Sequence, residues 1–262
     1  MRDFEIINEN LRNALAAFSY VRHSGEVGET PGASLVHAGV NYSLFNTALL
    51  TEPVPGGPVP FSKVLDEAES FFRKRSAPWS LWFCDDLFTS SERRRSRISM
   101  ATRGLRLMME APGMIARQIS EPDRALPEFD CRPVGDARTR ADFSRIMSEA
   151  FQVPPGMADD VYSGEHLWQG PLRGFIAYVN DEPVSTTGIV AGGDSIGVYA
   201  VATMPRMQRR GYGEALMRRA IHLVRLETGI TRSVLQSSAA GYQLYLRMGY
   251  RNVTRFSVYV KA

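Results

Sequence analysis

The segment from Val201 to Glu214 constrains the fold of this chain more than any other part of its sequence. Residues typical of a β-strand end at Pro205, and Gly211 and Gly213 then open a stretch with the spacing of an amphipathic helix. A glycine turn at this junction lets the backbone approach an anion closely, because the free N–H groups of the first helical turn point toward it. Positive charge at the same end comes from three arginines: Arg206, Arg209 and Arg210.

Two common nucleotide-binding motifs do not fit this turn. No Gly-Lys-Ser or Gly-Lys-Thr follows the glycines, as the Walker loop requires, and the third glycine of the dinucleotide-binding fingerprint is missing. A Gly-x-Gly turn after a strand can also do no more than redirect the chain. The local pattern therefore leaves two interpretations open, a phosphate-binding turn outside both common nucleotide folds and a purely structural turn.

The pattern around this segment predicts an α/β (α+β) protein in which the C-terminal half forms a mixed sheet flanked by helices. A polar stretch around Pro154, Pro155 and Gly156 is predicted as a loop. The predicted order is β-α-β-β-β-α-β-α-β, over residues 129–134, 139–151, 174–179, 184–190, 196–203, 211–227, 233–235, 239–247 and 250–260.

The N-terminal half is predicted to contain the same order of strands and helices as the last part of the C-terminal half. It contains a strand, a proline-rich loop, a helix capped by Ser62, a strand, an Arg-rich helix, Gly104 and a strand. The strands and the loop are expected at 41–50, 51–60, 79–83 and 105–109. We interpret this half as a diverged repeat, with chance recurrence as the alternative because such orders are common in α/β proteins.

A domain boundary is expected in the segment from Glu121 to Pro127. Its two prolines, Pro122 and Pro127, disfavour a continuous helix or a central strand. We therefore expect an N-terminal α/β domain at residues 1–125 and a catalytic domain at residues 128–262.

Composition narrows the classes of partner. The chain has 31 Lys and Arg against 28 Asp and Glu, and the resulting net charge of +3 is too small to indicate a protein that binds nucleic acid. The cluster Arg93-Arg94-Arg95 with Arg97 is better interpreted as a solvated helix face, and docking on nucleic acid is the alternative. Cys84 and Cys131 have no second Cys or His at metal-ligand spacing, so we expect no metal. An acidic N-terminus and the absence of a long apolar run predict a cytoplasmic protein that does not span a membrane.

Two motifs together resemble the GNAT superfamily of acyl-CoA-dependent N-acyltransferases. Gln208, Gly211 and Gly213 match the family's Gln/Arg-x-x-Gly-x-Gly/Ala signature after a strand. Tyr245 and Gly249 match its Leu-Tyr-x-x-x-Gly-Phe ending, except that Tyr250 replaces the usual Phe. The resemblance covers residues from about 129 to 262 and does not extend to the first half, which has Gly56-Gly57 but no such signature.

The resemblance implies that acetyl-CoA is the cosubstrate and lies between two splayed parallel strands, 196–203 and 233–237. Backbone groups of Val201 and Thr203 would pair with the pantetheine arm like an added strand. The implied binding set is Val201, Thr203, Gln208, Arg209, Arg210, Gly211, Tyr212, Gly213, Glu214 and Ser237, with the amides from Arg209 to Glu214 on the pyrophosphate. Ser237 would bond the pantetheine or only cap the next helix.

The resemblance also implies a mechanism in which a neutral amine attacks the thioester and the leaving thiolate is protonated. Tyr245 matches the family's tyrosine near the sulfur and is our candidate general acid; packing under the sheet, with Tyr242 as the polar alternative, is the competing interpretation. No residue is assigned as the base. Solvated surface charge is the better interpretation of the available groups, Glu149, Asp159, Asp160, Glu165 and His166.

These observations predict transfer of an acetyl group from acetyl-CoA to a primary amine of a small molecule or a peptide. The acceptor itself is not specified, because acceptor pockets come from variable loops. The alternative is a non-catalytic acyl-CoA-binding sensor, in which the first half passes the bound state to a partner.

Overall fold

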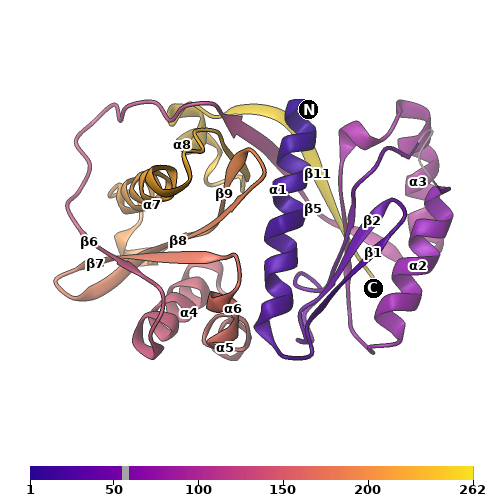
Figure 1. Ribbon diagram of the computed structural model, residues 1–262, viewed down its shortest axis with the longest axis horizontal. Helices are drawn as coiled ribbons and strands as arrows, with labels where there is room; N and C mark the ends of the chain where they lie inside the picture. Colours follow the sequence, from indigo (N-terminus) through magenta and orange to yellow (C-terminus); the bar gives the residue numbers. More distant parts are fainter. Residues whose placement is uncertain (55–58, 262) are drawn as a thin grey trace.

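The computed structural model describes residues 1–54 and 59–261. Its described strands form one mixed sheet in the order β1-β2-β3-β4-β11-β5-β10-β9-β8-β7-β6, with helices packed against it (Figure 1). The strands are Glu26–Thr30 (β1), Ala33–His37 (β2), Thr47–Leu50 (β3), Ser80–Cys84 (β4), Leu105–Ala116 (β5), Asp130–Pro133 (β6), Arg173–Val179 (β7), Glu182–Gly192 (β8), Ser195–Thr203 (β9), Ser233–Gln236 (β10) and Arg251–Lys261 (β11). The α-helices are Asp3–Ala17 (α1), Phe61–Arg73 (α2), Ser90–Thr102 (α3), Ala137–Phe151 (α4), Pro155–Tyr162 (α5), His166–Gln169 (α6), Tyr212–Thr228 (α7) and Tyr242–Arg247 (α8). The mixed α/β class predicted from the sequence is confirmed.

The last strand of each half lies in the middle of the sheet, beside the other half. Strand β5 pairs antiparallel with β10, and β11 pairs antiparallel with β4. The two exchanged strands also pair with each other along most of their length. Each half adds one parallel pair, β3 with β4 and β10 with β9, and an antiparallel meander that leads to an edge. The sheet is therefore nearly symmetric about the β5–β11 pair.

The repeated order of elements is present in both halves. The first half runs β3-α2-β4-α3-β5 and the second runs β9-α7-β10-α8-β11. Gly104 and Gly249 stand before the last strands and have φ angles of +75° and +92°, a left-handed conformation that favours glycine. The segment between β5 and β6, residues 117–129, contains no helix or strand.

The helices divide between the two faces of the sheet. Ala14 and Ala17 of α1 share a buried cluster with Phe143 and Ile146 of α4, whereas α7 and α8 contribute to a separate cluster with β5, β9 and β10. Figure 1 shows α1 between the two halves, with α7 and α8 on one side and α2 and α3 on the other.

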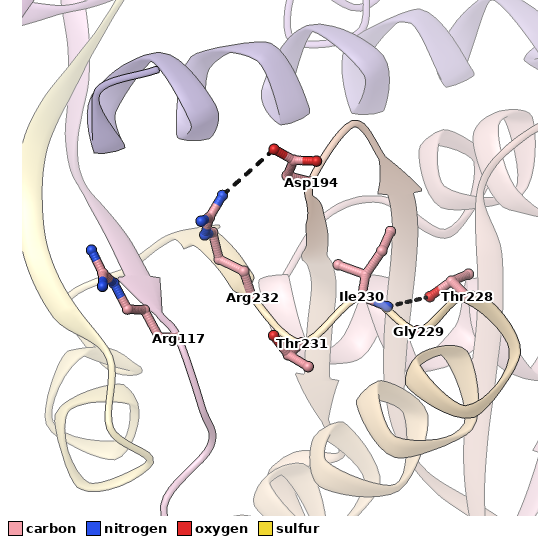
Figure 2. Close-up of a pocket in the computed structure, with 7 residues that line it drawn as sticks. All are labelled: Arg117, Asp194, Thr228, Gly229, Ile230, Thr231 and Arg232. Atoms are coloured by element: carbon pink, nitrogen blue, oxygen red, sulfur yellow. Dashed lines mark hydrogen bonds and ion pairs between the residues drawn. The ribbon is translucent and has the colours of Figure 1, made fainter.

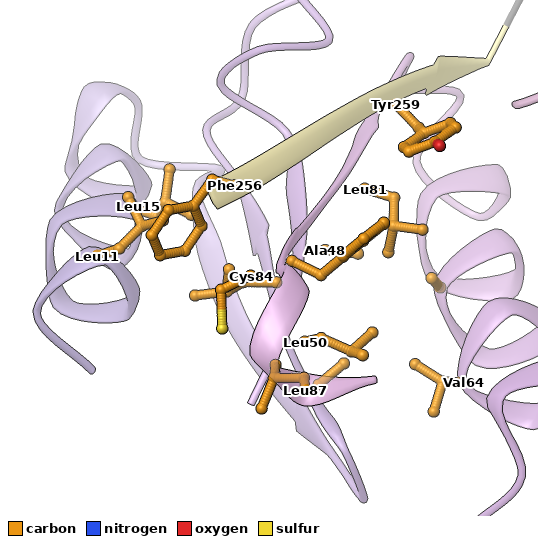
Figure 3. Packing of buried hydrophobic residues seen from close by; sticks show 14 of the residues in the cluster. Leu11, Leu15, Ala48, Leu50, Val64, Leu81, Cys84, Leu87, Phe256 and Tyr259 are labelled. Carbon is orange, nitrogen blue, oxygen red and sulfur yellow. The ribbon is translucent and has the colours of Figure 1, made fainter. Parts of the chain in front are cut away.

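A third cluster forms the core of the first half. Phe256 of β11 lies there beside Leu11 and Leu15 of α1 and near Cys84 of β4 (Figure 3). The last strand of the chain therefore completes the core of the first half, and the two halves cannot bury their apolar surface separately.

Three sequence expectations differ from the structure in the first half. The strand expected over 41–50 begins only at Thr47, because the buried Asn46 side chain bonds Val40 O, Tyr42 O, Pro78 O and the Ala38 N–H and holds a turn. Helix α2 begins at Phe61, so Ser62 lies inside it and Pro60 is its N-cap. Strand β5 continues to Ala116, beyond the predicted Met109. Residues 55–58 of the proline-rich loop, including Gly56-Gly57, lie outside the described residues.

The second half follows the predicted order but contains two further helices, α5 and α6. The stretch predicted as a loop begins α5 at Pro155, because proline is tolerated in the first turn, where no amide donor is needed. Helix α1 and strands β1 and β2 were not expected from the sequence.

Candidate active site

Strands β9 and β10 separate soon after they begin. They pair in parallel only at Ser233 with Ile196 and at Val234 with Gly197. Beyond these pairs β9 continues to Thr203 and β10 to Gln236 without a ladder between them. The backbone of β9 from Tyr199 onward therefore has a free edge on the β10 side, the kind of edge that an extended ligand can pair with.

A β-bulge in β9 shapes this edge. Ala200 has a φ angle of +47°, and the register with β8 shifts between the pairs Thr186–Ala202 and Gly188–Tyr199. Side chains of β8 hold the bulged backbone: Thr186 Oγ1 donates to Ala200 O at 2.9 Å and Ser185 Oγ to Ala202 O at 2.6 Å. Bulges next to a site re-aim the strand, and no local sequence signal predicted this one.

Val201 and Thr203, the residues expected to pair with pantetheine, both lie beyond the bulge on the free part of β9 and are half-buried. The Thr203 hydroxyl lies 2.9 Å from Ser185 Oγ. Gln208 donates from Nε2 to Thr203 O at 3.2 Å, so this signature side chain ties the turn to the strand. Thr203 O retains one lone pair for a ligand.

The glycine turn leads into α7 without a side-chain cap. Gly211 is the N-cap residue with φ of +93°, and no side-chain oxygen accepts from the first-turn amides. A methyl group on Gly213 would lie 3.0 Å from Thr203 Oγ1, so glycine allows the helix to start close to the strand. Arg209 and Arg210 are exposed, and Arg209 has a φ angle of +61°. Uncapped amides with arginines nearby form an anion-binding geometry.

Glu214 was expected only through its amide, but its side chain is 3% exposed. Oε1 accepts from Arg218 Nε at 2.9 Å and from Nη2 at 2.8 Å, which forms a two-pronged ion pair within α7. Oε2 has no hydrogen-bond partner, and Arg124 Nη2 is 4.0 Å away.

Tyr245 lies on α8 in the buried cluster that also holds Leu216 and Met217 of α7 and Leu235 of β10. It is 7% exposed, and burial raises its pKa to about 12. A methyl group on Gly241 would come within 2.6 Å of the tyrosine ring, so this glycine makes room for it. The phenol therefore keeps its proton at neutral pH on the helix that follows β10.

The neighbouring polar residues have structural contacts. Tyr250 Oη lies 2.5 Å from Ser233 Oγ, and its ring meets Tyr245 edge-on at 5.9 Å between centroids. Ser237 is buried; its N–H donates to Pro112 O and its Oγ to Ser238 O, both at 2.8 Å. Ser238, not Ser237, accepts the Gly241 amide at the start of α8.

Most of the residues considered as bases contact other side chains. Asp159 accepts from Ser144 Oγ at 2.6 Å, and Asp160 accepts from Arg22 at 3.0 Å and from Tyr42 at 2.9 Å. The imidazoles of His166 and His23 pack edge-to-face at 3.9 Å between centroids. Glu165 accepts from Gln169 at 3.0 Å, and Glu149 is exposed.

The Arg-rich helix was considered as a nucleic-acid contact. Its Arg93 pairs with Asp85 at 3.3 Å.

A cavity of about 430 Å³ lies away from this region, at the C-terminal end of α7 (Figure 2). It is lined by Arg117, Asp194, Thr228, Gly229, Ile230, Thr231 and Arg232. Helix α7 has 17 residues, so the cavity lies about 25 Å from the glycine turn. It does not adjoin the free edge of β9, and the candidate site rests on the turn and the separated strands.

No group of three or more His, Cys, Asp or Glu side chains among the described residues is arranged to hold a metal ion. No described helix has both the length and the apolar content needed to cross a bilayer.

Comparison with known proteins identifies the family of this site. Residues 140–250 match the model of the acetyltransferase (GNAT) family, so this part of the chain is a GNAT domain. No match was found among curated proteins.

Solved structures share the whole fold. A GCN5-related N-acetyltransferase from Kribbella flavida is 16% identical, with 95% of this chain and 94% of that chain covered and a TM-score of 0.66. A GCN5-related N-acetyltransferase-like protein from Streptococcus suis is 14% identical, with 97% and 99% covered and a TM-score of 0.55. A tandem GNAT protein from the clavulanic acid biosynthesis pathway is 11% identical, with 99% and 95% covered and a TM-score of 0.58. The chain thus has the fold of tandem GNAT proteins, and family and fold together support acyl transfer from acetyl-CoA as its general activity.

Proposed function

We propose that this protein transfers the acetyl group of acetyl-CoA to a primary amine of a small molecule or a peptide. One observation carries the proposal: the free edge of β9 beyond Gly197 lies next to the uncapped N-terminus of α7. The edge offers backbone partners to the pantetheine arm, and the turn offers amides to the pyrophosphate. The binding set is Val201, Thr203, Gln208, Arg209, Arg210, Gly211, Tyr212, Gly213, Glu214 and Ser237.

The proposed chemistry is direct transfer. The amine lone pair forms a C–N bond to the thioester carbonyl carbon, the resulting oxyanion collapses, and the C–S bond breaks. Tyr245 donates its phenolic proton to the departing thiolate, and the amine loses its extra proton to water. The raised pKa of Tyr245, a result of burial, keeps the proton available at neutral pH.

We also propose a division of labour between residues 1–125 and residues 128–262. The second unit carries the turn and Tyr245, and the first provides walls for the acceptor. Because β11 lies between β4 and β5, the units share one sheet and are expected to unfold together. Both cysteines, Cys84 and Cys131, are free thiols, which supports our proposal of a cytoplasmic location.

The test is thiol release from acetyl-CoA across a panel of amines, for the wild type, Tyr245→Phe and Gly211→Val. We expect acceptor-dependent turnover that both substitutions reduce. Saturable acetyl-CoA binding without turnover on any amine would contradict the transferase and favour the sensor.

A further inference from the structure

The linker between β5 and β6 passes near α8 on its way to β6 (Figure 1), and Arg124 and Pro127 of this linker lie beside Gly211 at the start of α7. Ser120 N–H donates to Met248 O at 3.0 Å, and Arg218 donates to Ser120 O. Asp123 lies 3.9 Å from Arg247 of α8. The linker is therefore fixed on the second half at several points before it reaches the glycine turn.

The last residues of the linker lie close to Gly211. A methyl group on this glycine would lie 3.1 Å from Pro127 Cδ and 3.6 Å from Arg124 Nη2. The Arg124 guanidinium thus lies beside the backbone that bears the uncapped amides of α7, although it belongs to the linker and not to the signature.

Charge and burial at this point favour an anion. The Glu214 carboxylate is balanced by Arg218, so the charge of Arg124 is in excess. Glu214 Oε2 is buried and without a hydrogen-bond partner, and Arg124 Nη2 is 4.0 Å away with its side chain 53% exposed. A guanidinium has five N–H donors, so one edge can approach Glu214 while the other bonds an anion at the turn.

We propose that Arg124 is a binding residue for the pyrophosphate of CoA, supplied by the linker between the two halves. This inference rests on the proposed function, because it takes CoA as the ligand of the turn. The Arg124 guanidinium then lies between two anions, with one edge toward Glu214 Oε2 and the other N–H donors available to the phosphate. The linker connects the halves and also forms one wall of the cosubstrate site.

Isothermal titration of the full chain tests this proposal, with CoA, 3′-dephospho-CoA and pantetheine as ligands. Arg124→Gln should weaken binding of CoA and 3′-dephospho-CoA by about tenfold each and leave pantetheine unaffected, because a charge-assisted hydrogen bond is lost. Arg124→Lys should restore part of the affinity, since lysine keeps the positive charge but lacks the planar set of N–H donors of the guanidinium. Arg247→Gln is the matched control, because Arg247 of α8 contacts the neighbouring linker residue Asp123 at 3.9 Å; it should change CoA affinity less than about twofold.

Two results would overturn the inference alone: equal affinity of Arg124→Gln and wild type for CoA, or a loss confined to CoA, which would place Arg124 at the 3′-phosphate. A wild-type protein that binds neither CoA nor 3′-dephospho-CoA would overturn the proposed function as well. Unchanged thermal unfolding of Arg124→Gln would show that the variant is folded.

Discussion

The two halves of this protein share an order of elements but differ where a strand gives way to a helix. Helix α7 begins after Gly211, with φ of +93° and free amides ahead of it. Helix α2 begins after Pro60, which has no N–H to offer. Neither helix has a side-chain cap, so the described difference is at the N-cap residue, which offers an N–H to a ligand in the second half and none in the first.

The parallel strand pairs, β3–β4 in the first half and β9–β10 in the second, also differ between the halves. In the first half the chain remains bonded across the gap after β3, because Val54 N–H donates to Leu87 O at 2.9 Å. Among the described residues of the second half, no such bond closes the space between β9 and β10 beyond Gly197. This open strand edge is where an added strand of ligand can pair.

The third difference concerns the candidate acid. Tyr245 precedes Gly249 with the same spacing as Met100 precedes Gly104. Met100 is fully buried on α3 and has no proton to donate. The two halves thus share one order of elements and differ at the N-cap residue, the strand edge and the position of Tyr245. These three differences support our proposal that only the second half is catalytic.

The largest expected effect comes from the turn. Gly211→Val should weaken acetyl-CoA binding by about a hundredfold or more, because a β-branched residue at positive φ displaces the amides. Gly229→Val, at the other end of α7 with φ of +72°, is the control. It should lower stability by about 1–2 kcal/mol and leave affinity unchanged. Titration calorimetry measures the effect on affinity and urea unfolding the effect on stability. Equal losses of affinity in both variants would contradict a cosubstrate site at the N-terminal end of α7.

The next effect concerns Tyr245 and its counterpart. Tyr245→Phe should lower kcat by about a hundredfold with little change in acetyl-CoA affinity, because only proton donation is lost. Met100→Leu should leave kcat unchanged. With a pKa of about 12, Tyr245 should cause no fall in rate up to about pH 11. Steady-state rates against pH check this, and an unaltered kcat in Tyr245→Phe would reject its role.

Ion pairs should differ in strength between the halves. Arg218→Met leaves the Glu214 carboxylate, 3% exposed, without its partner and should lower the free energy of unfolding by about 3 kcal/mol. Arg103→Met removes pairs with Asp66 and Glu69, whose side chains are 63% and 23% exposed, and should lower it by about 1 kcal/mol. Urea unfolding measures both losses. Equal losses would contradict a larger contribution of the buried Glu214–Arg218 pair to stability.

The smallest expected effect is a fall in stability at alkaline pH. Burial raises the pKa of Tyr245 above its unfolded value, so its contribution is complete below about pH 10 and is lost as pH rises toward 12. Burial also raises the pKa of Tyr162, Tyr199 and Tyr250 in the second half. The slope of unfolding free energy between pH 10 and 12 should be shallower in Tyr245→Phe. An identical slope would show that Tyr245 is not buried in solution.

Local patterns predicted a good part of this molecule. The strand, glycine turn and helix around Gly211 could be read from residues close in sequence, and so could the repeated order of elements. The roles of these residues at the site stay predictions. The exchange of β5 and β11 could not be predicted, because it pairs residues more than 100 positions apart and either strand satisfies the same pattern.

The parts of the site that depend on distant contacts were also missed. Arg124 approaches Glu214 only because the linker is held by Met248 and Arg218. The bulge at Ala200 arises from side chains of the neighbouring strand, Ser185 and Thr186. Both features combine segments whose proximity is decided by the fold and not by local propensity.

The measurement that tests the comparison most directly is the stoichiometry of acetyl-CoA binding to the full chain by titration calorimetry. We predict one acetyl-CoA per chain, with affinity lowered about a hundredfold or more by Gly211→Val and unchanged by Pro60→Ala in the first half. Two molecules per chain, or one bound with unchanged affinity in Gly211→Val, would contradict the assignment of the cosubstrate site to the second half.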